Sequence, residues 1–245
     1  MTANYRMADI TFSVTSVYES VHRYCSDYRT DAPAEFEIVI GRGDIEAERI
    51  HNERTAKAEG RTPIDAPPDY LEALAVYRKF CTLSVDRDVM LFHGSAVAVD
   101  GEAYLFTAPS GTGKSTHTRL WREYLSDRAV MVNDDKPLIR LPEQGTPLIY
   151  GTPYNGKHRL GCNMSAPLKA VCVLTRSAEN RIRPVKKSEI YHILLQQTFR
   201  PADPVQLAKT LTLIDRLAAG TKLYLLGCNM DISAAETAYN TMRGE

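Results

Sequence analysis

The spacing of apolar positions predicts short strands and helices in the first part of the chain. Residues 10–14 and 36–40 alternate apolar and polar side chains, as half-buried strands do. Residues 44–59 are polar and rich in helix-forming types, and Gly60 ends that segment. Apolar side chains recur at helical spacing through residues 69–84. This part of the chain therefore mixes strands with helices.

A denser series of short apolar runs follows, as is typical of a larger sheet. Strands are predicted at residues 89–92, 95–99, 103–107, 129–132, 137–141, 148–150, 168–174 and 223–226. Asp100-Gly101 is a hairpin turn sequence between two of these strands. Helices are predicted at residues 114–125, 187–199, 204–219 and 232–242. Because strands and helices mix along the whole length, the predicted fold class is α/β with some antiparallel pairing.

A proline-bearing segment, residues 61–68, is the best candidate for a domain boundary. Proline removes a backbone donor and fixes the chain direction, so such segments interrupt regular structure. We therefore expect an N-terminal α+β extension at residues 1–66, packed on the core, and a larger domain at residues 67–245. A chain of this length is sufficient to bury a hydrophobic core.

Composition and charge exclude several classes of protein. Hydrophobic residues make up 44% and charged residues 24% of the chain, which excludes a disordered protein. Thirty basic residues balance thirty acidic ones, which is unfavourable for a broad nucleic-acid-binding face. The sequence contains neither an apolar run near the ~20 residues of a membrane helix nor a secretory signal. Five scattered cysteines without Cys-x-x-Cys spacing favour a reducing, cytoplasmic location over disulfides or structural zinc.

The most specific motif lies at residues 108–116, Ala-Pro-Ser-Gly-Thr-Gly-Lys-Ser-Thr. It matches the phosphate-binding P-loop, except that Ala108 stands where the pattern has its first glycine. A predicted apolar strand precedes the motif and a predicted amphipathic helix follows it, which is the setting that a P-loop requires. Loop N–H groups and the helix N-terminus then surround phosphate oxygens. The predicted nucleotide-binding residues are Ser110, Gly111, Thr112, Gly113, Lys114, Ser115 and Thr116.

Side-chain roles follow from the chemistry of phosphoryl transfer. Lys114 would place a cation on the β- and γ-phosphates, and the Ser115 hydroxyl would bind Mg²⁺. A later predicted strand ends in Asn133-Asp134-Asp135, and a carboxylate beside a P-loop commonly holds Mg²⁺. Adjacent side chains on an extended chain point in different directions, so one acid can face the metal and the other a substrate hydroxyl. A solvated turn or a helix cap is the alternative interpretation.

Two other segments are candidates on residue type alone. His93-Gly94 ends a predicted strand, and a single histidine fits a structural role as well as a functional one. The loop at residues 151–159 includes Lys157, His158 and Arg159. These side chains could supply positive charge to a transferring phosphoryl group, or the loop could simply be solvated.

The order of these motifs resembles the catalytic domain of the HPr kinase/phosphorylase family. That family has a His-Gly, then a Gly-x-Ser-Gly-x-Gly-Lys-Ser loop, then a paired Asp-Asp. Here His93-Gly94, residues 108–115 and Asp134-Asp135 stand in those places. The resemblance covers residues 90–174. It implies an α/β P-loop core like that of phosphoenolpyruvate carboxykinase, with a mixed sheet and flanking helices.

The resemblance also implies an activity. It suggests an ATP- and Mg²⁺-dependent kinase that phosphorylates a hydroxyl of a protein, peptide or small molecule. Asp134 would be the general base, and Asp135 would coordinate Mg²⁺ together with Ser115, although the two acids could exchange roles. Lys114 and His93 complete the catalytic set that the resemblance implies. Because members of the family associate, a homo-oligomer is also expected.

Some features depart from the family. Residues 1–66 do not look like its N-terminal domain, and residues 151–161 replace its arginine- and glycine-rich segment. Neither HPr as the acceptor nor the reverse phosphorolysis is therefore implied. By the resemblance, Lys157 and Arg159 would contact the phosphate or the acceptor.

Three other functions can be compared with a kinase. The first is a nucleotide-binding regulatory module without phosphotransfer, but the doubled acid favours a kinase because binding alone needs one metal-binding acid. The second is a transport or mechanochemical ATPase, which is disfavoured because the sequence has no Leu-Ser-Gly-Gly-Gln-like motif. The third is phosphoenolpyruvate carboxykinase activity, which is disfavoured because that enzyme is a considerably longer chain.

Overall fold

The computed structural model describes residues 1–58, 60, 62–63, 65–156 and 158–244. It divides the chain into two compact units, Met1–Ser84 and Val85–Glu245. The boundary therefore follows the helix α3 (Pro68–Ser84) instead of preceding it, as the proline-bearing segment had suggested. The reason lies in packing, because α3 contacts the first two helices of the N-terminal unit and its Phe80 ring lies 4.6 Å from that of Phe12.

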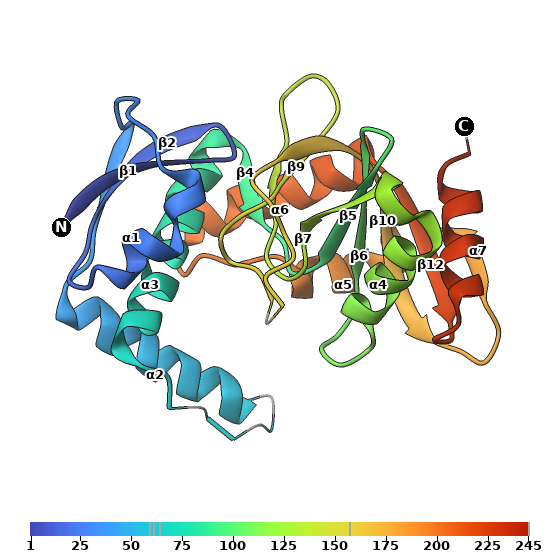
Figure 1. Cartoon of the computed structure of the whole chain (residues 1–245), viewed down its shortest axis with the longest axis horizontal. Helices are drawn as coiled ribbons and strands as arrows, with labels where there is room; N and C mark the ends of the chain where they lie inside the picture. Colours follow the sequence, from blue (N-terminus) through green and yellow to red (C-terminus); the bar gives the residue numbers. More distant parts are fainter. Residues whose placement is uncertain (59, 61, 64, 157, 245) are drawn as a thin grey trace. The chain divides into compact units, whose positions relative to one another are not determined.

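The N-terminal unit is a small sheet covered by helices (Figure 1). Its elements are β1 (Thr2–Met7), β2 (Ile10–Thr15), α1 (Ser20–Tyr24), η1 (Ser26–Tyr28), β3 (Phe36–Val39), α2 (Arg42–Ala58) and α3. Strand β2 pairs antiparallel with β1 and parallel with β3. The rings of Tyr5, Phe12, Phe36 and Phe80 form its aromatic core. The sequence patterns predicted β2, β3, α2 and α3 but not β1 or α1.

The second unit contains one mixed sheet of nine strands among the described residues. They are β4 (Val89–Leu91), β5 (Ser95–Val99), β6 (Glu102–Thr107), β7 (Ala129–Asn133), β8 (Leu138–Arg140), β9 (Leu148–Tyr150), β10 (Ser165–Arg176), β11 (Arg181–Pro184) and β12 (Lys222–Cys228). The main path runs β4-β8-β9-β10-β6-β5-β7, and β12 pairs with both β10 and β11. Only β11 had no counterpart among the predicted strands.

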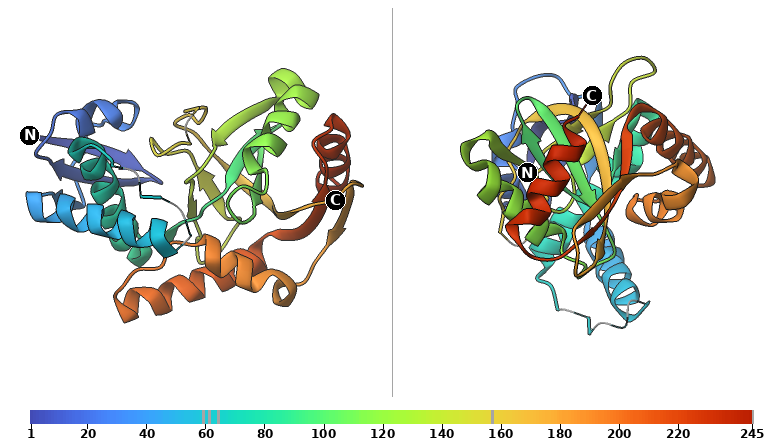
Figure 2. Two further views of the ribbon diagram at one scale, coloured as in Figure 1. Left: turned by 90° about the horizontal axis from the view of Figure 1, so that it is seen from below. Right: turned by 90° about the vertical axis from the view of Figure 1, so that its right-hand side faces the viewer.

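Helices cover both faces of this sheet. They are α4 (Lys114–Leu125), α5 (Lys187–Gln197), α6 (Pro204–Gly220) and α7 (Ile232–Met242), with short 3-10 turns at Val85–Arg87 and Ser126–Arg128. Figure 2 shows α4 and α7 on one face and α5 and α6 on the other. Alternate residues of β6 point to opposite faces, since Leu105 packs with α5 and α6 while Phe106 packs with α4 and α7. The predicted mixed α/β class with flanking helices is confirmed. In the described part of the chain, no helix combines the length and apolarity needed to cross a bilayer.

The strand directions bring three distant segments to one edge of the sheet. Strand β5 pairs antiparallel with β6 on one side and with β7 on the other, so β6 and β7 run in the same direction. Ser95 is paired with Phe106, and Ala96 with Asn133. The start of β5 therefore lies between the ends of β6 and β7, which is where His93, the glycine-bearing loop and the acid pair meet.

Candidate functional site

The glycine-bearing loop connects the end of β6 to the start of α4. Gly111 and Gly113 have φ angles of 77° and 124°, in the region that favours glycine. Both positions have open space where a Cβ would lie, so backbone conformation rather than crowding selects glycine. Ala108 is buried and is not among the described residues with positive φ, so alanine fits where the P-loop pattern has its first glycine. The two glycines thus adopt backbone conformations that other residues rarely take.

Lys114 is the first residue of α4, and its side chain is buried. Its Nζ donates a hydrogen bond to the Ala108 carbonyl oxygen at 2.8 Å, so the ammonium lies against the loop. Burial lowers the pKa of Lys114, and the nearby Asp135 carboxylate opposes that shift. A buried cation is costly without an anionic partner, so an anion bound at this loop would be stabilised by Lys114.

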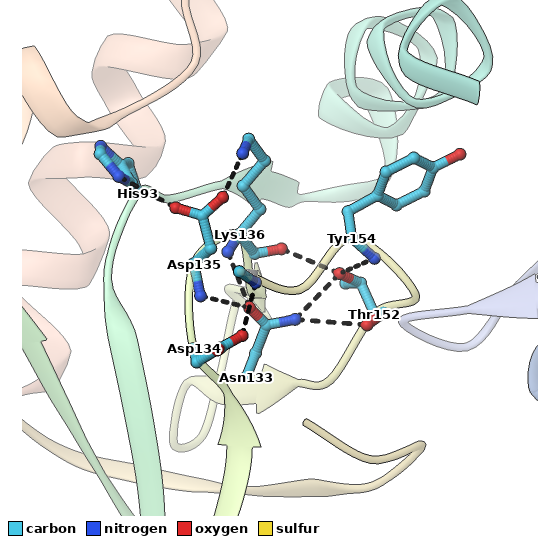
Figure 3. A network of polar contacts seen from close by, with 8 residues as sticks. His93, Asn133, Asp134, Asp135, Lys136, Thr152 and Tyr154 are labelled. Atoms are coloured by element: carbon cyan, nitrogen blue, oxygen red, sulfur yellow. Dashed lines mark hydrogen bonds and ion pairs between the residues drawn. The ribbon is translucent and has the colours of Figure 1, made fainter. Parts of the chain in front are cut away.

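The end of β7 turns sharply at the acid pair. Asn133 Oδ1 accepts hydrogen bonds from the backbone N–H groups of Asp135 at 2.9 Å and Lys136 at 2.7 Å. This side-chain bond closes a turn directly after the strand. The carboxylates of Asp134 and Asp135 consequently point in different directions (Figure 3). The sequence had predicted divergent carboxylates from an extended chain, whereas the structure separates them by a turn after β7.

Asp135 is held between the side chains of His93 and Lys136. His93 Nε2 lies 3.1 Å from Asp135 Oδ1, and the Lys136 ammonium pairs with Oδ2. Burial raises the pKa of Asp135, but the hydrogen bond from His93 and the charge of Lys136 outweigh it and lower that pKa to about 2. Asp135 is therefore a carboxylate at any physiological pH.

Asp134 points to the opposite side and is buried. Its Oδ1 accepts a hydrogen bond from the Gly156 backbone N–H at 2.6 Å. A Cβ on Gly156 would come within 3.0 Å of Asp134 Oδ2, so this loop approaches the carboxylate closely because residue 156 is glycine. The loop after β9 therefore fixes the position of Asp134.

Thr152 ties the same loop to the turn that carries the acids. Asn133 Nδ2 donates to Thr152 Oγ1 at 3.0 Å, and Thr152 Oγ1 donates to the Lys136 carbonyl oxygen at 3.0 Å. The Tyr154 backbone N–H donates to the same hydroxyl at 3.2 Å. Figure 3 shows this network beside the acid pair. The sequence had named Asn133 and the loop at residues 151–159, but not these contacts, because they depend on the pairing of β9 with β8 and β10.

A cavity of about 470 Å³ opens beside the loop. Ser115, Thr116 and Asp134 line it together, so the first helical turn of α4 and one acid face the same space. Asp135, in contrast, is paired with His93 and lies 24% exposed. The two acids therefore have separate surroundings, as two separate roles require.

The oxygen donors present here fit a Mg²⁺–nucleotide complex. Mg²⁺ is usually bound by one or two carboxylates, substrate phosphates and water, rather than by a cage of protein ligands. The site offers the Ser115 hydroxyl and the carboxylates of Asp134 and Asp135 around a buried lysine. The described residues contain no cluster of three or more His, Cys, Asp or Glu side chains that could hold a metal ion.

The structure brings together most of the residues predicted for the site. Lys114, Ser115, Asp134, Asp135 and His93 gather at one sheet edge. The other predicted nucleotide-binding residues follow on the same loop and helix; they are Ser110, Gly111, Thr112, Gly113 and Thr116.

The loop at residues 151–159 carries three candidate basic or titratable side chains. Arg159 is exposed, with a φ of 47°, and Lys157 lies outside the described residues. His158, the third candidate, lines the cavity. Two contacts were missed from the sequence: Lys136 on Asp135, and Arg176, whose Nη2 donates to the Gly111 carbonyl oxygen at 2.5 Å. The basic residue directly after Asp135 was a visible signal, whereas Arg176 meets the loop only through the pairing of β10 with β6.

Comparison with known proteins finds similarity among solved structures. No family model matches the chain, and no curated protein matches it. Among solved structures, the HPr(Ser) kinase/phosphatase from Coxiella burnetii aligns with a TM-score of 0.32 and 12% sequence identity. The alignment covers 63% of this chain and 99% of that one. The function of the chain therefore has to be inferred from its own residues.

Proposed function

We propose that the protein is an ATP- and Mg²⁺-dependent phosphotransferase that phosphorylates a hydroxyl group, with a P-loop core of the HPr kinase and phosphoenolpyruvate carboxykinase type. The observation that carries this proposal is the meeting of the Lys114 loop with two differently oriented acids at one sheet edge. Phosphoryl transfer needs mainly positioning and charge neutralisation, and this edge supplies both.

The loop and α4 would hold the nucleotide phosphates. The Lys114 ammonium would leave the Ala108 carbonyl for a phosphate oxygen, which compensates its buried charge. Loop N–H groups and the N-terminus of α4 would add hydrogen bonds and a positive dipole end. Mg²⁺, held by Ser115 and Asp135, would neutralise charge on the phosphates.

The different surroundings of the acids support different roles. A general base must reach the acceptor's proton, and Asp134 lines the cavity with one carboxylate oxygen bonded to Gly156. A metal ligand must stay ionised, and the contacts of Asp135 with His93 and Lys136 lower its pKa and keep it so. His93 would fix the orientation of Asp135 through the 3.1 Å contact. It would therefore act as a positioning residue.

In the proposed transfer step, each bond that forms is matched by a bond that breaks, and Asp134 accepts the proton. The acceptor oxygen forms a bond to the γ-phosphorus while the bond from that phosphorus to the ADP oxygen breaks. The electron pair leaves with ADP, and the acceptor's hydroxyl proton moves to the Asp134 carboxylate. No oxidant, reductant or further reactant is needed.

A single-turnover experiment tests the proposal. The protein is mixed with γ-labelled ATP, Mg²⁺ and a panel of serine-containing peptides and free serine, and labelled products are counted. We expect Asp134→Asn to abolish transfer while a nonhydrolysable ATP analogue still binds. Full transfer by Asp134→Asn would remove the base assignment. Tight nucleotide binding with no transfer by the wild-type protein would instead favour the regulatory binding module.

A further inference from the structure

The cavity beside Asp134 continues along one face of α4. Ser115, Arg119 and Arg122 line it, at intervals of four and three residues that place them on the same side of a helix. Met131 of β7 and Leu160 line it as well. The cavity thus has the transfer site at one end, two arginines farther along the helix, and apolar surface beside them.

The two arginines differ in what neutralises them. Arg119 Nη1 lies 2.5 Å from Glu123 Oε1, and its side chain is about half exposed. Among the described residues, nothing forms a hydrogen bond or an ion pair with the side chain of Arg122, and its Nε is buried. A guanidinium without an anionic partner can bind a carboxylate in a bidentate fork. Because Arg122 lines the cavity and no described residue neutralises it, it is available to an anionic group there.

The helix sets the distance between this cation and the reacting end. Ser115 and Arg122 are seven positions apart (122 − 115), which is about 10 Å along the axis at 1.5 Å per residue. An extended peptide covers that length in about three residues. A ligand that spans this whole length is longer than a small hydroxy acid. A volume of about 470 Å³ is also within the range of ligand pockets.

We infer that this cavity binds the phosphoacceptor, and that the acceptor is a peptide segment with a carboxylate about three residues from its serine or threonine hydroxyl. The inference rests on the proposed phosphotransferase. The hydroxyl lies at Asp134 and the carboxylate at Arg122, while Met131 and Leu160 contact the intervening side chains. His158 adds a further polar group to the wall of the cavity.

Binding of matched peptides tests the inference without relying on catalysis. Heptapeptides carry a central serine and an aspartate three residues before or after it, and the controls carry asparagine instead. Affinity is measured by calorimetry with Mg²⁺ and a nonhydrolysable ATP analogue present, or with the protein alone if the analogue does not bind. One aspartate peptide should bind at least about tenfold more tightly than its asparagine control, which corresponds to about 1.4 kcal/mol.

Variants identify the residue responsible. Arg122→Gln should remove the preference for aspartate. Arg181→Gln is the matched control because it removes the same charge from a side chain that is 82% exposed and paired with Glu179, and it should keep the preference. Glu123→Gln should retain or strengthen the preference, since it frees Arg119 for the ligand.

Each other outcome has a definite meaning. Equal affinity for the aspartate and asparagine peptides, or no binding of either, overturns the inference. Glycerate that binds as tightly as the aspartate peptide, and only with Arg122 intact, overturns the peptide assignment in favour of small anions. An aspartate preference that depends on Arg122, without any phosphate transfer, supports the binding site and counts against the kinase.

Discussion

The buried charged side chains of the two units have different kinds of bonding partner. In the N-terminal unit, the buried Glu72 accepts hydrogen bonds from the Val17 and Tyr18 backbone N–H groups at 2.6 and 2.8 Å. The buried Glu48 there forms an ion pair with Arg78. In the second unit, buried Lys114 has a carbonyl partner and no anion in hydrogen-bond contact among the described residues.

This contrast distinguishes buried charged side chains that stabilise the fold from a buried charged side chain that could bind a ligand. A buried charge that is fully bonded within the protein holds the fold together, and a ligand gains little by approaching it. A buried cation beside a loop and a cavity, bonded only to a neutral oxygen, gains free energy when an anion arrives. The comparison therefore favours the second unit as the place of the proposed chemistry.

The largest expected effect is that of Lys114→Ala. Removing the cation should lower phosphotransfer at least about 1,000-fold, because stabilisation of the phosphoryl charge is lost in a water-poor site. The measurement is single-turnover transfer from γ-labelled ATP. Lys187→Ala is the control, since Lys187 is exposed and pairs with Asp215. Transfer above a tenth of the wild-type rate in Lys114→Ala would contradict the role given to this residue.

The aromatic core of the N-terminal unit should matter for stability but not for nucleotide binding. Phe12→Ala removes a fully buried ring that lies 4.6 Å from Phe80, and it should cost about 4 kcal/mol of unfolding free energy in that unit. Binding of an ATP analogue should stay unchanged under conditions where the variant is folded. Urea unfolding and calorimetry provide the two readouts.

Phe106→Ala is the matched change in the second unit. Phe106 lies next to last in β6, and its ring is 5.0 Å from that of Trp121 on α4. This variant should lose similar stability and also weaken binding of the analogue, because it disturbs the packing between β6 and α4. If Phe12→Ala weakened nucleotide binding as much as Phe106→Ala does, the division of roles between the units would be wrong.

The local motif was predictable, whereas the contacts around it were not. Residues 108–116 predicted the loop and the start of α4 because backbone conformation there depends on glycines within a few positions. The meeting of His93 with Asp135 depends on β5 lying between β6 and β7, which no short pattern encodes. The motif resemblance placed these residues in one site only by analogy.

The predicted domain boundary differs from the observed one for a related reason. Prolines at residues 63, 67 and 68 mark a break in regular structure, but they do not say which core the next helix joins. Phe80 assigns α3 to the N-terminal unit through its packing on Phe12 and Phe36. Likewise, the sequence placed Arg122 on a predicted helix but did not show that its side chain lines a cavity.

A third, smaller effect concerns acid stability. The pKa of Asp135 is lowered from 3.8 to about 2, so its ion pairs stabilise the fold above pH 4. That contribution, about 2 kcal/mol at 1.36 kcal/mol per unit, is lost as the pH falls from about 4 through 2. Asp135→Asn should therefore lose less stability than the wild type over this range, as measured by urea unfolding. Asp127→Asn, at an exposed turn, should behave like the wild type.

The smallest changes are single methyl groups at one glycine in each unit. Gly156→Ala places a Cβ 3.0 Å from Asp134 Oδ2, so the carboxylate has to shift. We expect transfer to fall about tenfold with nucleotide affinity unchanged, because displacement of a general base affects the chemical step. Gly43→Ala adds the same methyl group in open space on α2, and it should stabilise the N-terminal unit by about 0.5 kcal/mol without affecting transfer. If Gly156→Ala left transfer unaltered, the close approach of this loop would not position Asp134 for catalysis. The contrast between the units would then rest on Lys114 alone.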